Sequence, residues 1–313
     1  MNGLMKIITV NLNPAYDIYY RVPGFRQYKE NLAESVSVFT GGKGMNVSRA
    51  LKTNGIGSTA YLLLGRENSQ AYTDGITADG IDARIFYASG RIRENLTFLT
   101  DGIPETRVSV NSFYASPTDL RKILQALSEE CLPDTVIVCS GKFPKGISTG
   151  CAMDFVRELK KISQRVVLDS NTFTAEQVVS LSPWLIKPND EEIETLCGRP
   201  VSGTDDCLSA AEELFRGGIS NVFVTLGENG AVYCGELGKC RASVPHIAPL
   251  STIGAGDSTV AGFVAAYSSG RPLEDCVRTA CAFGTAACLE VGTNPPKPER
   301  VAELYRQIKI TIL

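Results

Sequence analysis

The sequence predicts an α/β protein with a mostly parallel β-sheet, helices on both faces of that sheet, and a small β-sheet lid. Short β-branched runs alternate with amphipathic segments along much of the chain, a pattern typical of parallel sheets that are covered by helices. Two long stretches interrupt this alternation, and glycine-rich turns stand directly before two of the helical segments. The length of 313 residues fits one such domain spanning residues 1–313.

The expected elements follow from these two periodicities. The expected strands are residues 6–10, 59–64, 134–139, 165–169, 184–187 and 221–225. The expected helices are residues 45–54, 117–131, 146–163, 174–182 and 205–216, followed by two consecutive helices within residues 254–289. Ligands of such sheets bind beyond the carboxyl ends of the strands, so we look for functional residues there.

The two interruptions lie at residues 16–40 and 83–111. Both contain short strand-like runs, and neither contains a convincing helical pattern. We expect them to pair into a small sheet that stands off the main domain and covers a cleft, since a closing lid excludes water from a reaction. The alternative is a pair of ordinary surface hairpins.

Composition excludes several classes of function. The net charge is −3 and no long basic run occurs, which argues against nucleic acid or an anionic membrane as a partner. No apolar run approaches the length of a membrane helix. The ten cysteines form no C-x-x-C pair, so we expect buried thiols and a reducing cytoplasm. His246 is the only histidine, which excludes a histidine-based triad and a multi-histidine metal site.

The first candidate site is the run Gly254-Ala255-Gly256-Asp257, which precedes an apolar helix. The glycines allow a tight turn whose amide groups form an anion hole at the helix N-terminus. Asp257, on the first turn, is then placed to accept a proton from an attacking hydroxyl, as phosphoryl transfer requires. A plain helix cap is the alternative interpretation.

Two further motifs belong to the first quarter of the chain. Gly42 and Lys43 open a helix, and Asn46 follows three residues after the lysine. The glycine lets the backbone approach a ligand, and the lysine supplies a positive charge. Asp17 follows the first strand and can accept hydrogen bonds from sugar hydroxyls. Simple turns would account for both motifs as well.

The last two motifs point to a nucleotide and its metal. Asn189 and Glu192 lie one helical turn apart after Lys187, and an amide with a carboxylate can steer hydrated Mg²⁺. A capped, acidic helix start is the alternative. A strand, a glycine-rich turn and a second strand follow, in which the candidates for contacting a nucleotide are Thr225, Gly227 and Gly230. A plain β-turn is the alternative for this motif.

Each motif is weak alone, but their order along the chain is specific. The succession N-P-x-x-D, G-G-K-G-x-N, K-P-N-x-x-E and G-A-G-D, from residue 11 to about residue 284, resembles the ribokinase-like (PfkB) carbohydrate kinase family. The first two motifs resemble its branch of 1-phosphofructokinases and tagatose-6-phosphate kinases. The resemblance implies a catalytic base at Asp257, an anion hole at residues 254–256 and a Mg²⁺ site at Asn189 and Glu192.

The resemblance also implies a nucleotide site and a substrate site. The nucleotide site would use Lys187, Asn189, Thr225, Gly227 and Gly230. The substrate site would use Asp17, Gly42, Lys43 and Asn46, together with Arg93 and Asn95 from the lid. Members of the family close the site with a small sheet and often dimerise through it, so we expect a homodimer.

Two positions depart from the branch pattern. The lid usually reads T-R-x-N-x-K, whereas Thr97 stands here in the lysine position. The usual S-G-S-L-P reads Ser-Gly-Lys-Phe-Pro, which adds Lys142. We therefore hypothesise that Lys142 partly replaces the missing lysine in holding the phosphate of the substrate.

The function that the sequence supports best is ATP- and Mg²⁺-dependent phosphorylation of a phosphosugar, with fructose 1-phosphate converted to fructose 1,6-bisphosphate. The alternatives within enzymes are a tagatose-6-phosphate kinase and a 6-phosphofructokinase. The alternative from another class is a non-catalytic regulator that binds a phosphosugar.

Overall fold

A large β-sheet forms the centre of the computed structural model, which describes residues 4–110 and 113–313. Residue 111, the end of the second expected insertion, lies outside the described residues. The strands of this sheet are β1 (Ile7–Asn11), β4 (Thr59–Gly65), β5 (Asp82–Ala88), β8 (Val136–Ser140), β9 (Arg165–Asp169), β10 (Leu185–Ile186), β11 (Asn221–Thr225), β12 (Ala231–Gly235), β13 (Gly238–Ser243) and β14 (Lys309–Ile312). Their order is β14-β13-β12-β11-β10-β9-β8-β1-β4-β5.

The strands from β11 through β5 run parallel to one another, whereas β12, β13 and β14 are antiparallel additions. The six strands expected from the sequence are all present in the parallel part. Because parallel strands end at the same edge of a sheet, the residues that close β1, β8, β9, β10 and β11 come together. That edge carries the candidate site.

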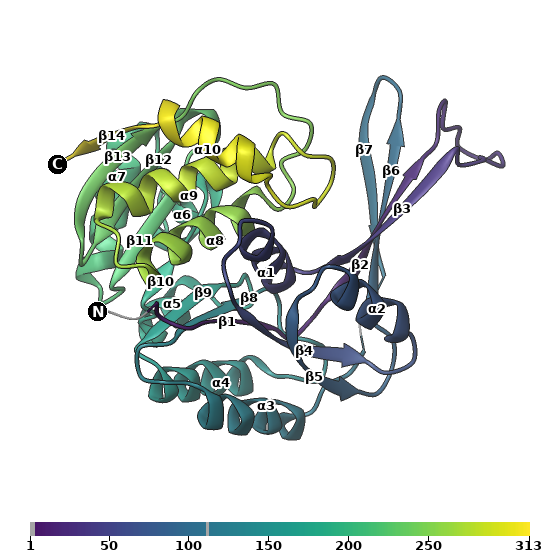
Figure 1. The fold of residues 1–313 in the computed structure, drawn as a ribbon, viewed down its shortest axis with the longest axis horizontal. Helices are drawn as coiled ribbons and strands as arrows, with labels where there is room; N and C mark the ends of the chain where they lie inside the picture. The colour runs from purple at the N-terminus through teal and green to yellow at the C-terminus, as the bar shows by residue number, and fades with distance from the viewer. Residues whose placement is uncertain (1–3, 111–112) are drawn as a thin grey trace.

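Helices cover both faces of the sheet (Figure 1). One face carries α1 (Lys43–Thr53), α2 (Gln70–Ala78), α8 (Ala255–Ser268), α9 (Leu273–Ala287) and α10 (Pro298–Gln307). The other face carries α3 (Pro117–Glu130), α4 (Thr149–Ile162), α5 (Ala175–Leu181), α6 (Asp190–Cys197) and α7 (Gly203–Arg216). Both faces of the sheet are therefore buried. In β1, Ile7 packs in the core beneath α8, and the next residue, Ile8, packs in the core beneath α4.

The apolar helix expected after residue 254 is α8, and close packing explains its small residues. A Cβ atom placed on Gly262 would lie 2.7 Å from the carbonyl oxygen of Thr279 in α9. Only glycine allows the two helices to approach this closely. The helix is therefore held firmly, which fixes the position of Asp257 on its first turn.

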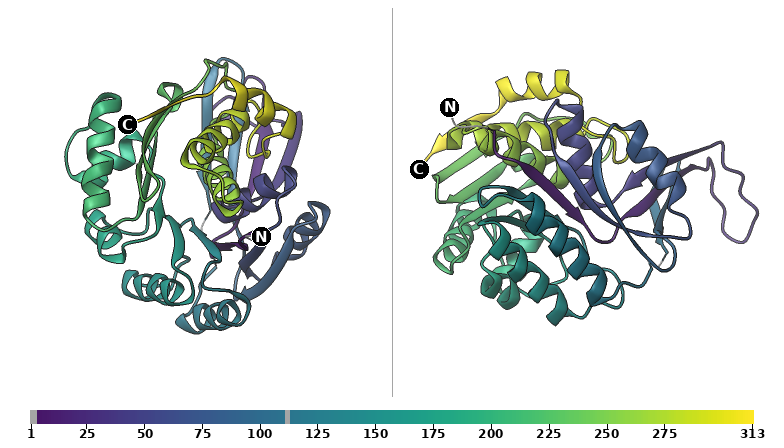
Figure 2. Two further views of the ribbon diagram at one scale, coloured as in Figure 1. Left: turned by 60° about the vertical axis from the view of Figure 1, so that its left-hand side comes forward. Right: turned by 60° about the horizontal axis from the view of Figure 1, so that its bottom comes forward.

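A second, smaller sheet stands off the main body, as expected (Figures 1 and 2). Its strands are β3 (Ser35–Gly41), β2 (Ala15–Arg21), β6 (Arg93–Thr100) and β7 (Ile103–Ser109), in that order. β2 pairs with β6 in register, so Asp17 lies opposite Asn95. We call this four-stranded sheet the lid, and its covering function remains a prediction.

The structure assigns part of the second insertion to the main sheet instead. Residues 82–88 form β5, which pairs with β4 along its whole length. The pattern of this edge strand, with half-exposed residues on one side, resembles the pattern of a lid strand. The sequence interpretation also did not include α2, α10 or β14, whose amphipathic patterns are short. Among the described residues no helix is long and apolar enough to cross a membrane.

Candidate active site

Asp257 lies on the first turn of α8, at the edge where the parallel strands end. Gly254 caps the helix with a left-handed backbone, φ +77°, which glycine adopts without strain. The side chain of Asp257 is almost fully buried, with 6% of the residue exposed. The glycine turn predicted from the sequence is thus present, and it places the buried carboxylate at the N-terminus of α8.

The amide groups of this turn differ in their hydrogen bonds. The Ala255 N–H group donates to the Thr252 carbonyl at 3.4 Å. The N–H groups of Gly256 and Asp257 belong to the first turn of a helix, where amides have no acceptor within the helix. These two amides, together with the helix dipole, are the donors suited to an anion. Lys187 adds a cation, because a Cβ atom on Gly256 would lie 3.0 Å from its Nζ.

The surroundings of Asp257 make its carboxyl group a weaker acid than usual. Burial, and next the charge of Asp169, raise the pKa of Asp257 to about 6. The charge of Lys43 and a hydrogen bond from Asn46 act in the opposite direction. A carboxylate whose pKa lies near neutrality takes up and releases protons readily. Such a shift is typical of functional groups in clefts.

Lys43, the first residue of α1, forms an ion pair that the sequence did not predict. Its Nζ lies 2.9 Å from Oδ1 of Asp169, the last residue of β9. Asp169 is buried, with 6% exposed. The sequence feature that could have identified Asp169 is its position at the end of an expected strand, because parallel sheets place ligand-binding residues there.

Three lid residues assigned to the substrate form one network. Asn95 Nδ2 donates to Asp17 Oδ1 at 2.7 Å, and Arg93 donates to Asn95 Oδ1 at 3.0 Å. Asp17 lies against Gly41, where a Cβ atom would fall 2.0 Å from its Oδ2. Burial raises the pKa of Asp17 and lowers the pKa of Arg93. The lid thus presents a carboxylate, an amide and a guanidinium side by side.

Several buried polar atoms near this network lack a hydrogen-bond partner among the described residues. They are both amide atoms of Asn11, Oδ1 of Asn13, Oδ1 of Asn46 and Oγ of Ser140. Elsewhere in the described chain only Arg241 and Thr293 contain such atoms. Buried polar atoms are costly when unpaired, so their concentration here indicates a place for a hydroxyl-bearing ligand or water. The sequence interpretation assigned no role in the site to Asn11, Asn13 or Ser140.

The residues predicted to contact the nucleotide line one cavity of about 480 Å³. They are Lys187, Asn189, Thr225, Gly227 and Gly230. Ala255 and Gly256 line it as well, so the cavity opens onto the turn before Asp257. The volume lies in the range of small-ligand pockets. Further lining residues that the sequence did not reveal include Cys281 and Cys288 on and after α9.

Asn189 and Glu192 form a reciprocal capping box at the start of α6. Asn189 Oδ1 accepts from the Glu192 N–H group at 2.7 Å, and Glu192 Oε2 accepts from the Asn189 N–H group at 3.0 Å. The alternative interpretation, a capped helix start, is therefore present in the structure. The capping box is compatible with the predicted metal site, because a carboxylate retains further lone pairs and Mg²⁺ uses few protein ligands.

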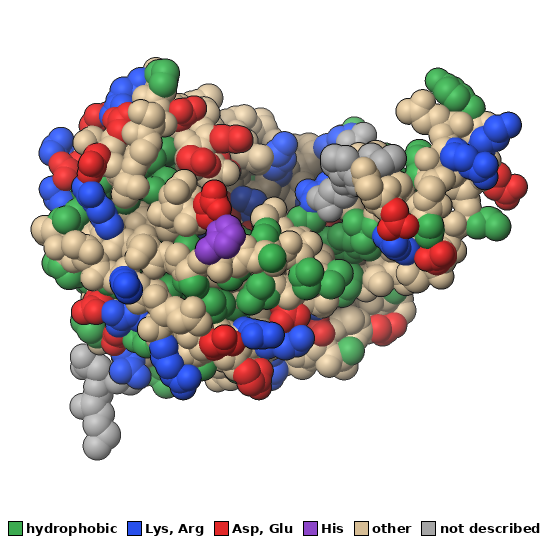
Figure 3. Space-filling model, turned by 90° about the horizontal axis from the view of Figure 1, so that it is seen from above, with side chains coloured by type: hydrophobic (Ala, Val, Ile, Leu, Met, Phe, Trp, Pro, Cys, Tyr) green, Lys and Arg blue, Asp and Glu red, His purple; other side chains and the backbone are tan. Residues whose placement is uncertain are grey.

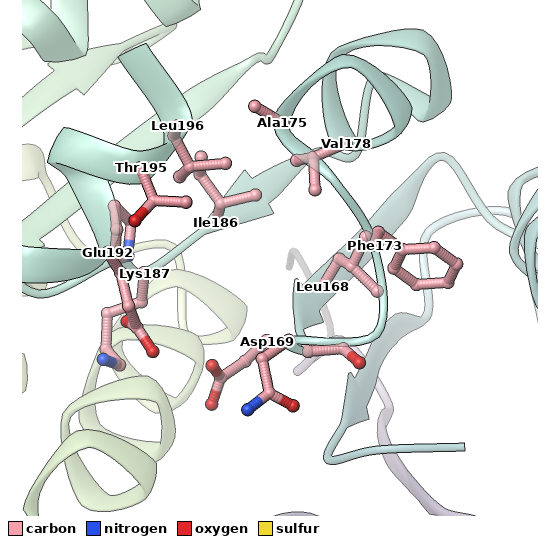
Figure 4. Close-up of a pocket in the computed structure, with 13 residues that line it drawn as sticks. Leu168, Asp169, Phe173, Ala175, Val178, Ile186, Lys187, Glu192, Thr195 and Leu196 are labelled. Atoms are coloured by element: carbon pink, nitrogen blue, oxygen red, sulfur yellow. The ribbon is translucent and has the colours of Figure 1, made fainter. Parts of the chain in front are cut away.

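A second cavity, of about 310 Å³, adjoins the same edge of the sheet. Figure 4 shows Asp169, Lys187 and Glu192 on one side of it and apolar side chains such as Val178 and Leu196 on the other. Lys187 lines both cavities. Lys187 is thus shared by the two cavities, whereas Asp169 and Glu192 line only the smaller one.

Figure 3 shows a hollow between the main body and the lid, with Lys and Arg side chains inside it. The two residues that depart from the branch pattern differ in burial. Thr97 is buried on β6 at 4% exposed, opposite Arg107 on β7. Lys142 is exposed in the turn after β8. His246, in contrast, is a solvent-exposed residue at 87% side-chain exposure.

Comparison with known proteins places this geometry in a family. Residues 6–300 match the model of the pfkB family carbohydrate kinases. The chain is 30% identical to 1-phosphofructokinase of Escherichia coli K12 over 96% of this chain and 97% of that protein. It is 31% identical to 1-phosphofructokinase of Rhodobacter capsulatus over 99% and 98% of the two chains.

A solved structure supports the fold. Phosphofructokinase-2 from Escherichia coli, in complex with substrates and products, superposes with a TM-score of 0.89 at 24% identity. The superposition covers 97% of this chain and 99% of that chain. The family match, the curated relatives and this shared architecture agree over nearly the whole length, and the chain is a member of the pfkB family of carbohydrate kinases.

Proposed function

We propose that this carbohydrate kinase transfers the γ-phosphoryl group of ATP to a hydroxyl of fructose 1-phosphate. The observation that carries the proposal is the buried Asp257, whose pKa is raised to about 6 at the N-terminus of α8. Relatives named 1-phosphofructokinase, at up to 31% identity over nearly the whole chain, support the choice of sugar. Tagatose 6-phosphate and fructose 6-phosphate are the alternative acceptors.

The proposed mechanism begins with a hydrogen bond between the acceptor hydroxyl and Asp257 Oδ1. Asn46 Nδ2 donates to Oδ2 at 2.8 Å and so orients the carboxylate. As the hydroxyl oxygen attacks the γ-phosphorus, its proton passes to Asp257 and the bond to the leaving ADP oxygen breaks. The N–H groups of Gly256 and Asp257, with Lys187, stabilise the charge on the transferred group.

The remaining predicted residues divide between the two substrates. We assign Asp17, Asn95, Gly42 and Asn46 to the sugar, and Lys43, Arg93 and Lys142 to its phosphate. The cavity of about 480 Å³ takes the nucleotide. Mg²⁺, when bound with ATP, neutralises phosphate charge. Glu192, with Asn189, would hold it largely through water.

The partner that we propose is a second copy of this chain, bound through the lid. The face of the lid opposite Asp17 and Asn95 carries a partly exposed apolar patch, which we call the outer lid patch. Its residues are Ile18, Tyr20, Val36, Val38, Leu96, Phe98 and Val108. Ile18 also packs against the core that includes residues of α2. Val36 and Val38 are 51% and 57% exposed. Large exposed apolar patches mark interaction sites, and we place the dimer in the cytoplasm.

The test is ADP release from ATP with purified protein and a panel of acceptors. The panel contains fructose 1-phosphate, fructose 6-phosphate, tagatose 6-phosphate, fructose and ribose. Preference for fructose 1-phosphate supports the proposal, and preference for another phosphosugar replaces the substrate but keeps the mechanism. Turnover of unphosphorylated sugars alone contradicts the roles of Lys43 and Arg93. Binding of phosphosugars without any turnover supports the regulator instead.

A further inference from the structure

Asp169 occupies a central place in the site, although neither sequence motifs nor the proposed mechanism assign it a role. It ends β9, next to Ser140 at the end of β8. Its carboxylate is almost fully buried, with 7% of the side chain exposed, and its Oδ1 lies 2.9 Å from Lys43 Nζ. A buried carboxylate needs a partner to offset the loss of hydration, and Lys43 is that partner.

Lys43 is also the residue that we assign to the phosphate of the sugar. Its side chain remains 39% exposed, so an arriving anion can reach the ammonium group. A phosphate carries more negative charge than one carboxylate, and it presents several acceptor oxygens. The substrate therefore competes with Asp169 for the same cation.

We propose that Asp169 is a positioning residue. In the free enzyme its carboxylate binds Lys43, and when the substrate arrives Lys43 leaves Asp169 and binds the phosphate of the substrate. This inference rests on the proposed function. Once Lys43 binds the substrate, its positive charge no longer offsets the negative charge of the Asp169 carboxylate near Asp257. Asp257 then holds a proton more strongly, and becomes the better base, only when a phosphosugar is bound.

The charged and polar groups around Asp257 come from several elements. α1 contributes Lys43 and Asn46, β9 contributes Asp169, and Lys187 follows β10. Of these, the charge of Asp169 raises the pKa of Asp257, whereas Lys43, Asn46 and Lys187 lower it. When Lys43 moves away, its lowering effect on the pKa of Asp257 is lost, and the raising effect of Asp169 remains.

The central variant is Asp169→Asn, with activity measured against pH and phosphosugar concentration. KM for the phosphosugar should fall about twofold to fivefold, because Lys43 no longer has a competing carboxylate. The acid limb of the kcat profile should move to lower pH by about one unit. The kcat plateau should fall about threefold to tenfold, since a weaker base accepts the proton less readily. Damage to the fold alone would not lower KM.

Two control variants make this result specific. Asp169→Glu keeps the charge and should restore the position of the acid limb. Glu191→Gln removes an exposed carboxylate from the first turn of α6 and should leave both KM and the acid limb unchanged. If Asp169→Asn instead raises the Mg²⁺ concentration needed for half-maximal rate, with the acid limb unmoved, Asp169 acts on the metal and the proposal is wrong.

A stability measurement tests the ion pair without any turnover. Lys43→Met should lower Tm, since it leaves the Asp169 carboxylate buried without its partner, and the double variant Lys43→Met/Asp169→Asn should recover most of that loss. Phosphosugar should raise the Tm of Asp169→Asn more than the Tm of the native chain. Additive effects of the two substitutions on Tm would overturn the pairing, whereas an inactive native chain with coupled Tm effects would overturn only the proposed function.

Discussion

Asn46 Nδ2 donates a hydrogen bond of 2.8 Å to Asp257 Oδ2, although 211 residues separate them in the chain. The contact joins α1 to α8, and so joins the two glycine-rich turns that open these helices. Asn46 Oδ1 is meanwhile buried without a partner among the described residues. Asn46 Nδ2 thus orients the carboxylate, and Asn46 Oδ1 remains available to a ligand.

Replacement of Asp257 by asparagine tests the base directly. The neutral amide keeps the shape of the side chain but accepts no proton, so kcat should fall about 10²-fold to 10⁴-fold. ATP binding should stay close to normal, because the adjoining cavity is unchanged. Steady-state kinetics with an equilibrium ATP-binding measurement distinguish these effects. An Asp257→Asn variant with near-native turnover would remove Asp257 from the mechanism.

The pKa of Asp257 also predicts how activity and stability depend on pH. The kcat/KM of the native chain, which reports the free enzyme, should rise with pH through about 6, as the base loses its proton. The folded-state pKa of about 6 lies above the ordinary 3.8, so stability from this group is present below about pH 4. That stability is lost as pH rises to about 6.

Asp257→Asn should therefore stabilise the free protein at pH 8 and make little difference at pH 4. A shift of about two pKa units corresponds to about 3 kcal/mol. Chemical denaturation at the two pH values measures the difference. Equal effects of the substitution at both pH values would contradict a raised pKa.

Asn11 offers a test of the unpaired amides. Asn11→Leu should raise the stability of the free protein by about 1–3 kcal/mol, because it replaces a buried amide that has no described partner. The same substitution should raise KM for the phosphosugar and reduce its stabilising effect in thermal shift. The matched control is Asn54→Leu, which removes hydrogen bonds to the Ala50 and Pro296 carbonyls and should destabilise. Loss of stability in Asn11→Leu would show that a bound water already satisfies the amide.

Substitution of Lys142 tests the hypothesis that this residue replaces the lysine that the branch pattern has at position 97 in holding the phosphate of the substrate. Lys142→Ala should raise KM for the phosphosugar about threefold to tenfold and leave KM for ATP unchanged, as expected for loss of one phosphate contact. Lys145→Ala removes another exposed lysine of the same loop and should have no such effect. An unchanged KM for every phosphosugar of the panel would refute the role of Lys142.

The outer lid patch predicts the assembly. Val38→Lys places a charge on an exposed position of this apolar surface, on the edge strand β3, and should convert the dimer to monomer in analytical ultracentrifugation. Leu132→Lys, at an exposed residue after α3, is the control and should remain dimeric. A native chain that is monomeric at all accessible concentrations would contradict the proposed dimer.

Much of the fold followed from local patterns in the sequence. The alternation of strands and helices, the lid and the glycine turn before α8 depend on periodicity and on backbone preferences, which neighbouring residues determine. The edge strand β5 was misassigned because its half-exposed pattern is shared by lid strands. The order of the motifs indicated the family before any contact was known.

The sequence by itself determined which chemical groups are available: two glycine-rich turns, Asp257, the lysines at 43, 142 and 187, and a lid with Asp17, Arg93 and Asn95. Only the tertiary structure decided which of them interact. The Lys43–Asp169 ion pair, the Asn11 amide that lacks a partner within residues 4–110 and 113–313, and the raised pKa of Asp257 arise where parallel strand ends converge. Burial and the distances between charges set these properties, and both depend on residues far apart in the chain.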